Sequence, residues 1–179
     1  MDVVEPYVVM ARYNAWMNRK LYAAADTLTD DDRRRDLGAF FHSLHGTLNH
    51  LVLTDRAWLV RFTENPALLQ SLDGTMPEFS GRLDQELYAD FATLRRERDK
   101  TDADIINWAQ GLTAEALAAP IAYYSAAYQR QYEHPLWWAA THFFNHQTHH
   151  RGQVTTLLLQ LGCDPGTTDL VDLLRNDLA

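Results

Sequence analysis

The sequence predicts an all-α protein, a four-helix bundle with short extra helices. Four long segments carry apolar residues at steps of three and four, which is the spacing of one helical face. Glycine and proline are few and fall between these segments, and no convincing strand run separates them. Long helices without a sheet bury their apolar faces against one another. Because 179 residues suit one core, we expect residues 1–179 to form a single domain.

The first two helices are expected over residues 7–28 and 37–62. Thr29 and the three aspartates after it are residues that commonly cap helices, so the first helix should end near them. In the second segment, apolar residues recur at helical spacing from Phe40 to Phe62. The sequence then predicts an irregular connection over residues 66–81 with one short helical turn.

The third helix is expected over residues 83–111. It contains a run of charged residues at positions 95–100, which we interpret as a solvated helix face. Thr113, followed by alanine and glutamate, is typical of a short capped helix, and Pro120 ends it.

The stretch 121–132 is ambiguous because its tyrosines favour extended structure while their spacing also suits a helix. We interpret it as irregular or hairpin-like. The fourth long helix is expected over residues 135–161, with Gly162 at its C-terminal stop. Residues 167–176 should form a short terminal helix.

Charge and composition exclude several classes of protein. The chain has 16 lysines and arginines against 24 aspartates and glutamates, a net charge of −8. Nucleic acids and anionic membranes attract basic surfaces, so we expect neither as a partner. The single cysteine, Cys163, cannot form an intrachain disulfide. No signal-peptide pattern and no membrane-length apolar run is present, so we expect a cytoplasmic protein.

Histidine carries most of the functional information. Seven of the eight histidines fall on two predicted helices: His42, His45 and His50 on the second, and His142, His146, His149 and His150 on the fourth. Two helices that bring histidines inward can build a metal site inside a bundle.

The spacing within the fourth helix narrows the choice of ligands. Residues four apart project from one face about a turn apart, so two imidazoles there can hold one ion. At about 100° per residue, His146 and His150 lie nearest the apolar face, whereas His142 and His149 lie at its margin. On the second helix the same analysis leaves His45 and His50 as alternatives.

Simpler interpretations remain open at this point. A single histidine on an amphipathic helix is more often packed or solvent-exposed than metal-bound, and Asp55, within the apolar face, needs a partner when buried. It orients a ligand or pairs with an arginine. Zinc fingers are excluded because the chain has a single cysteine. Zincins are excluded because Gln147 stands where their glutamate base would be.

Three sequence strings resemble the DinB-like family, also called the DinB/YfiT superfamily. The most specific is Asn-His-Gln-Thr-His-His-Arg-Gly-Gln at residues 145–153. The second helix contributes Thr-Leu-Asn-His-Leu at 47–51 and Asp-Arg-Ala-Trp-Leu at 55–59, and the first helix a softer match at 13–18. Together the resemblance covers roughly residues 6–165.

This resemblance implies an up-down-down-up bundle, usually dimeric, so we expect a homodimer. It also implies a divalent metal ion, commonly Ni or Zn, held by one histidine of the second helix and two of the fourth. By position these are His50, His146 and His150. Characterised enzymes of the family are mostly metal-dependent transferases or isomerases that use low-molecular-weight thiols, and many members have no known activity.

Residues around these histidines have secondary predicted roles. Asn145 and Gln153 are candidates to hydrogen-bond the ligating histidines, and Arg151 is a candidate to pair with a carboxylate such as Asp55. Aromatic residues form the core or the walls of a pocket. Those expected at the first and second helices are Tyr13, Trp16 and Trp58, and those expected near the entrance are Tyr124 and Tyr128.

The leading hypothesis is a metal-dependent thiol S-transferase acting on a small-molecule substrate, with a low-molecular-weight thiol as co-substrate. A metal-dependent hydrolase is the second hypothesis. A non-catalytic metal- or ligand-binding stress protein is the third. A bundle whose histidines are incidental would bind no stoichiometric metal.

Overall fold

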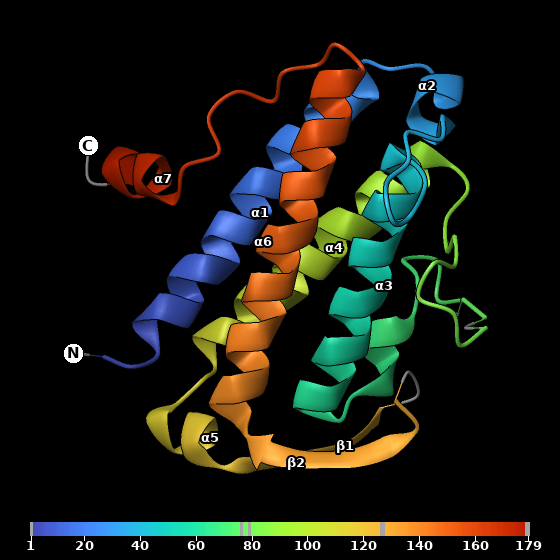
Figure 1. The fold of residues 1–179 in the computed structure, drawn as a ribbon. Helices are drawn as coiled ribbons and strands as arrows, with labels where there is room; N and C mark the ends of the chain where they lie inside the picture. The colour runs from blue at the N-terminus through green and yellow to red at the C-terminus, as the bar shows by residue number, and fades with distance from the viewer. Residues whose placement is uncertain (1, 76, 79, 126–127, 178–179) are drawn as a thin grey trace.

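The fold is a bundle of four long helices, seen in a computed structural model that describes residues 2–75, 77–78, 80–125 and 128–177. In Figure 1, α1 rises, α3 and α4 descend, and α6 rises again. Both α1 and α3 pack against α4 and α6, so α1 and α3 occupy opposite corners. This arrangement confirms the predicted all-α bundle. The long helices are α1 (Glu5–Asp26), α3 (Leu44–Thr63), α4 (Phe91–Gln110) and α6 (Leu136–Gln160).

Short helices lie in the connections between the long ones and after the last of them. Thr29 and Thr113 cap two of them, because each hydroxyl accepts a hydrogen bond from a backbone N–H three residues on. The last helix lies beside α1 (Figure 1), where the Tyr13 hydroxyl donates to the Thr168 carbonyl at 2.5 Å. These elements are α2 (Asp30–Arg34), the 3₁₀ turn η1 (Pro66–Leu69), α5 (Ala114–Ala118) and α7 (Leu170–Asp177).

A β-hairpin closes the lower end of the bundle in Figure 1, although the sequence contains no convincing strand run. Strands β1 (Pro120–Ser125) and β2 (Arg130–Pro135) pair antiparallel, with Tyr123 opposite Tyr132. Cross-strand aromatic pairs stabilise such ribbons, and these two rings stack at 5.9 Å. The hairpin alternative for the tyrosine-rich stretch is therefore the one the structure contains.

Two long helices begin later than their apolar spacing predicts. The Ser43 hydroxyl accepts a hydrogen bond from the Gly46 N–H at 3.1 Å, so α3 begins at Leu44 instead of residue 37. Phe40 and His42 consequently lie outside the helix, and Phe40 is 79% exposed. Similarly, the Asp90 carboxylate accepts from the Thr93 N–H at 2.7 Å, and α4 begins there instead of at residue 83.

The prediction that the charged run at residues 95–100 forms a solvated face is wrong for two of its residues. Glu97 and Arg98 are buried, with 2% and 1% of their surface exposed. The Arg98 Nη1 donates to Asp55 Oδ2 at 2.7 Å, and its Nη2 lies 2.9 Å from Asp102 Oδ1. Glu97 pairs with Arg56 of α3. Buried charges require such partners, so α4 joins α3 through ion pairs as well as apolar packing.

Gly46 permits a close approach that fixes the loop before α3. A Cβ at this position would lie 2.3 Å from the Phe41 carbonyl oxygen, which is inside van der Waals contact. We expect Gly46→Ala to force this loop away and to cost roughly 1–3 kcal/mol of unfolding free energy through overpacking. Urea denaturation of the metal-free protein measures this cost.

The matched control is Gly152→Ala, within α6, where a Cβ has no heavy atom within 4 Å. Both variants gain the higher helix propensity of alanine. The difference between them therefore isolates the clash. Equal stability of the two variants would contradict this account of the loop.

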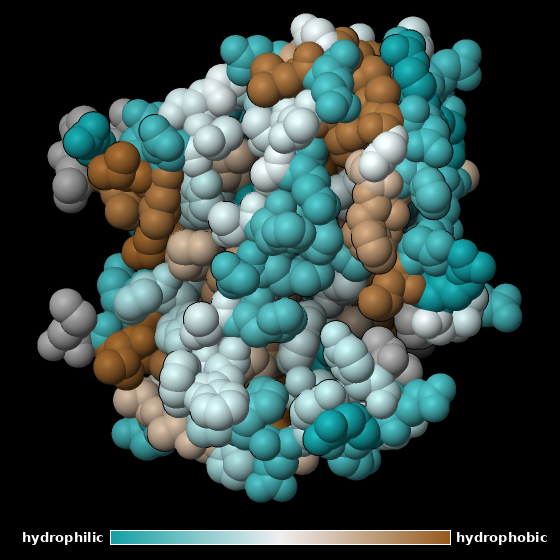
Figure 2. Space-filling model, in the orientation of Figure 1, coloured by the Kyte–Doolittle hydropathy of each residue, from teal (hydrophilic) through white to brown (hydrophobic). Residues whose placement is uncertain are grey.

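The outer face of the bundle shown in Figure 2 is mainly hydrophilic or near neutral, with hydrophobic groups gathered over α7 and near the top. Among the helices of the described chain, none is both long enough and apolar enough to cross a membrane.

Candidate metal centre

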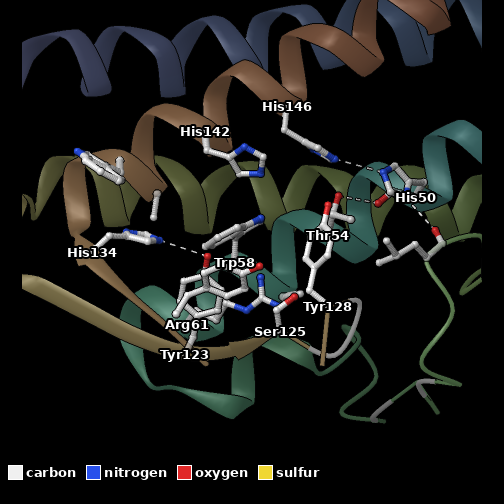
Figure 3. A pocket seen from close by; sticks show the side chains of 15 residues that line it. His50, Thr54, Trp58, Arg61, Tyr123, Ser125, Tyr128, His134, His142 and His146 are labelled. Carbon is white, nitrogen blue, oxygen red and sulfur yellow. Dashed lines mark hydrogen bonds between the residues drawn. The ribbon is translucent and has the colours of Figure 1, made fainter. Parts of the chain in front are cut away.

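Three histidines from two helices converge inside the bundle. His50 comes from α3, and His146 and His150 come from successive turns of α6. One ring nitrogen from each lies within 4.8 Å of the others, and the Nε2 atoms of His50 and His146 are 3.4 Å apart. Figure 3 shows the rings of His50 and His146 directed toward each other. The structure thus brings together the three histidines that the family resemblance selected.

Hydrogen bonds fix the tautomers of two of these rings. The Nδ1 of His50 lies 2.8 Å from the Leu83 carbonyl oxygen, and the Nδ1 of His150 lies 2.8 Å from Gln153 Oε1. Both oxygens only accept hydrogen bonds, so each Nδ1 carries the proton and donates it. The Nε2 lone pairs of His50 and His150 are therefore free to bind a metal ion.

Two contacts that sequence reasoning missed hold His50 in place. Phe41 is buried and stacks on the His50 ring, with the centroids 3.8 Å apart and the planes 20° apart. The second contact is the Leu83 carbonyl. Phe41 and Leu83 both lie in loops, where helical periodicity carries no signal. The one signal in the sequence is Gly46 of α3, which permits the loop that contains Phe41 to approach this helix closely.

The three rings are neutral in the metal-free protein at physiological pH. Burial lowers the pKa of His50 to about 4, an effect that the hydrogen bond to Leu83 partly opposes. Burial, together with repulsion from the neighbouring histidines when these are protonated, lowers the pKa of His146 to about 3. The pKa of His150 is also lowered, mainly by burial. Neutral imidazoles are the form that coordinates metal ions.

These shifts predict an acid-sensitive metal-free protein. Below about pH 6.5 the histidines of the unfolded chain bind protons, whereas His50 and His146 of the folded chain stay neutral until about pH 4 and 3. Since the unfolded state binds more protons, the free energy of unfolding falls as the pH drops through this window. The slope is up to roughly 1.4 kcal/mol per pH unit for each histidine.

Urea denaturation with EDTA from pH 7 to pH 4 measures this slope, with His146→Gln beside the wild type. We expect the variant to lose less stability on acidification, because one titrating group is gone. The buried Asp55 and Asp102, whose pKa values are raised mainly by burial, are common to both proteins. Parallel pH profiles would contradict the proposed neutral state of His146.

The remaining histidines of the two clusters lie outside this centre. His45, the alternative to His50, is buried with its Nε2 2.9 Å from the Tyr88 carbonyl oxygen, so it anchors the loop before α4. His142 packs against the ring of Trp58, and His149 lies beside the Gln153 side chain.

Predictions for the surrounding polar residues had mixed outcomes. Gln153 does hydrogen-bond His150, as expected. Asn145 is exposed and lines a separate hollow with Tyr7 and Thr148, since it precedes His146 by one residue and projects about 100° away from it. Its expected bond to a ligating histidine is therefore corrected.

The predicted pairing of Arg151 with Asp55 is also corrected. Asp55 faces Arg98 across the core, which is the structural ion pair that the sequence left as an alternative to orienting a ligand. Arg151 donates instead to the amide oxygen of Asn14 and to the Thr148 hydroxyl. Both networks lie between helices and stabilise the bundle around the histidines.

A cleft of about 640 Å³ opens from the histidines between α3, the hairpin and the start of α6. Trp58 and Tyr128 line it, as predicted for pocket residues. Tyr13 and Trp16 belong to the core cluster instead, and Tyr124 is 54% exposed outside the cleft. The lining residues are His50, Thr54, Ala57, Trp58, Arg61, Leu83, Tyr123, Ser125, Tyr128, Tyr132, His134, Trp138, Ala139, His142 and His146.

Comparisons with known proteins agree with this fold. A sequence model of the DinB family matches residues 3–177. The structure is similar to the crystal structure of a DinB-like protein from Bacillus cereus ATCC 10987, with a TM-score of 0.57 and 21% identity over 84% of this chain and 89% of that chain. At this identity the likeness concerns the fold alone. The comparison with curated proteins gave no match.

Proposed function

The chain belongs to the DinB family, and from that premise we propose that it binds a divalent metal ion and acts as a metal-dependent thiol S-transferase. The observation that carries the proposal is the convergence of three neutral imidazoles within 4.8 Å. Zn and Ni are the ions we propose, because nitrogen donors of this kind suit both.

The donor set fits an exchangeable metal site better than a closed structural one. Three protein ligands leave a coordination position for a small molecule, as in catalytic sites. His50 and His150 are held by Leu83 and Gln153 with their Nε2 atoms unprotonated, so little reorganisation is needed on loading. Phe41 covers one face of His50 and keeps water from it.

A bound divalent cation supplies positive charge that lowers the pKa of a coordinating thiol, which is then held as the reactive thiolate. The protein residues hold the site and receive the second substrate. The aromatic walls of the cleft, including Trp58 and Tyr132, provide apolar surface for an electrophile beside the histidines.

The cleft favours thiol chemistry over hydrolysis. Its described lining includes no aspartate or glutamate. A buried glutamine, Gln147, stands where a zincin has its carboxylate base. The chain therefore supplies no carboxylate there as a general base for a water molecule, whereas a thiol, which is more acidic than water, is deprotonated by the charge of a metal ion alone.

The test is metal loading followed by thiol titration. Tag-free protein is loaded with Zn²⁺, Ni²⁺ or Co²⁺ and its metal content is measured by elemental analysis, and the Co²⁺ form is titrated with cysteine and 2-mercaptoethanol. We expect one ion per chain and a new absorption band when thiol binds. Loading without any spectral response to thiols would contradict the transferase.

The same preparation separates the alternatives. Turnover of esters or amides without thiol would identify a hydrolase, and stoichiometric loading without turnover of any substrate would identify a non-catalytic binder. Failure to load any of the three ions would leave the histidines as incidental features of the core.

A further inference from the structure

The cleft extends well beyond the three histidines. Thr54, Trp58 and Arg61 follow His50 along one face of α3, and all four line the same space. At 1.5 Å per residue, the Cα of Arg61 lies about 16 Å along the helix from that of His50. In Figure 3, Arg61 lies beside Tyr123 of the hairpin, away from the labelled pair His50 and His146. The far end of the cleft therefore has its own chemistry.

Arg61 carries the positive charge at this far end. Its guanidinium lies over the Trp58 ring at 4.6 Å and the Tyr123 ring at 4.9 Å, so the group is fixed by two aromatic faces. Within the described chain, no acceptor hydrogen-bonds its N–H groups and no carboxylate pairs with it. The other titratable residues that line the cleft are histidines and tyrosines, and none of them is a carboxylate.

The half-buried Arg61 differs in this respect from Arg56 and Arg98, two buried arginines that are paired with carboxylates. Arg56 contacts Glu97, and Arg98 lies between Asp55 and Asp102. Burial lowers the pKa of Arg61, which reflects the cost of holding its charge without an anion. A charge in that position is stabilised when an anionic group enters the cleft.

We propose that Arg61 binds the carboxylate of a flat, aromatic or conjugated co-substrate, which lies among the cleft aromatics with its other end toward the histidines. A guanidinium presents paired N–H donors that match a carboxylate, and stacking on two rings leaves those donors at its edge. Trp58, Tyr132 and Trp138 offer the aromatic surface for a planar ligand. The role of this ligand as a co-substrate rests on the proposed function, whereas the binding of its carboxylate rests on Arg61 alone.

The test compares 1-naphthoate with the neutral 1-naphthamide by calorimetry on the metal-loaded full-length protein and again with EDTA. We expect the wild type to bind naphthoate at least ~10-fold more tightly in both conditions, the equivalent of one charge-assisted hydrogen-bonding pair. Arg61→Gln should remove the preference. Arg61→Lys should keep a reduced preference, because a point charge replaces the fork.

The matched control is Arg130→Gln, which removes an exposed arginine of β2 that stacks on Tyr132 but does not line the cleft. It should retain the wild-type preference. Equal binding of the two probes to the wild type, no binding of either, or an undiminished preference in Arg61→Gln would overturn the proposal.

The EDTA arm separates this proposal from metal binding. A naphthoate preference that appears only with metal and survives Arg61→Gln means that the carboxylate binds the ion, which also overturns the proposal. Conversely, a preference that persists in EDTA stands even if the protein fails to load metal.

Discussion

Arg98→Met is expected to lower the free energy of unfolding by about 3–5 kcal/mol. Arg98 is 1% exposed and lies between Asp55 of α3 and Asp102 of its own helix. Asn14 and Asn18 of α1 also donate to Asp102, at 2.8 and 2.9 Å. Methionine fills much of the same volume but leaves two carboxylates buried without their cation. Urea denaturation of the metal-free protein measures the loss.

The same charged run provides the control. Arg95 pairs with Asp26 at 2.9 Å, but both side chains are about half exposed. Surface pairs contribute roughly 0–1 kcal/mol, so Arg95→Met should be nearly neutral. If the two variants lost similar stability, the account of a buried ion network joining α1, α3 and α4 would be wrong.

The contrast between Arg95 and Arg98 shows which features of the fold can be predicted from the sequence and which cannot. Periodicity identifies four long helices because apolar residues mark the buried face. It misassigns Glu97 and Arg98, because a charged residue is buried only when partners on other helices meet it, and those partners are distant in sequence. The helix starts were missed for a local reason, since Ser43 and Asp90 interrupt α-helical backbone without interrupting the apolar spacing.

The residues of the candidate site were likewise predicted only in part. The helical wheel favoured His146 and His150, since both lie on one face of one helix. It could not separate His45 from His50, because the difference is made by a loop: the Tyr88 carbonyl accepts from His45, and the Leu83 carbonyl accepts from His50. The family resemblance supplied that choice. Arg61 gave no sequence signal, because its lack of a carboxylate partner is a property of the assembled cleft.

Replacing His146 is expected to abolish stoichiometric metal binding. In His146→Ala the remaining rings of His50 and His150 offer two nitrogens instead of three. Loss of a residue that merely orients a ligand costs about 10–100-fold in metal affinity, so loss of a ligand should exceed 100-fold. Elemental analysis after gel filtration should fall from about one Zn or Ni per chain to near zero, and competition with a chromophoric chelator gives the affinity.

His142→Ala is the matched control, because His142 and His146 form the other pair of histidines four apart on α6 and both line the cleft. The ring of His142 packs on Trp58, outside the three-histidine cluster, so this variant should bind metal like the wild type. Equal loss in both variants would place the ion lower on α6, at the 142/146 pair. Full metal content in His146→Ala would contradict the three-histidine centre. The Nε2 atoms of His146 and His50 are only 3.4 Å apart, and no other arrangement of the described histidines brings three donors together.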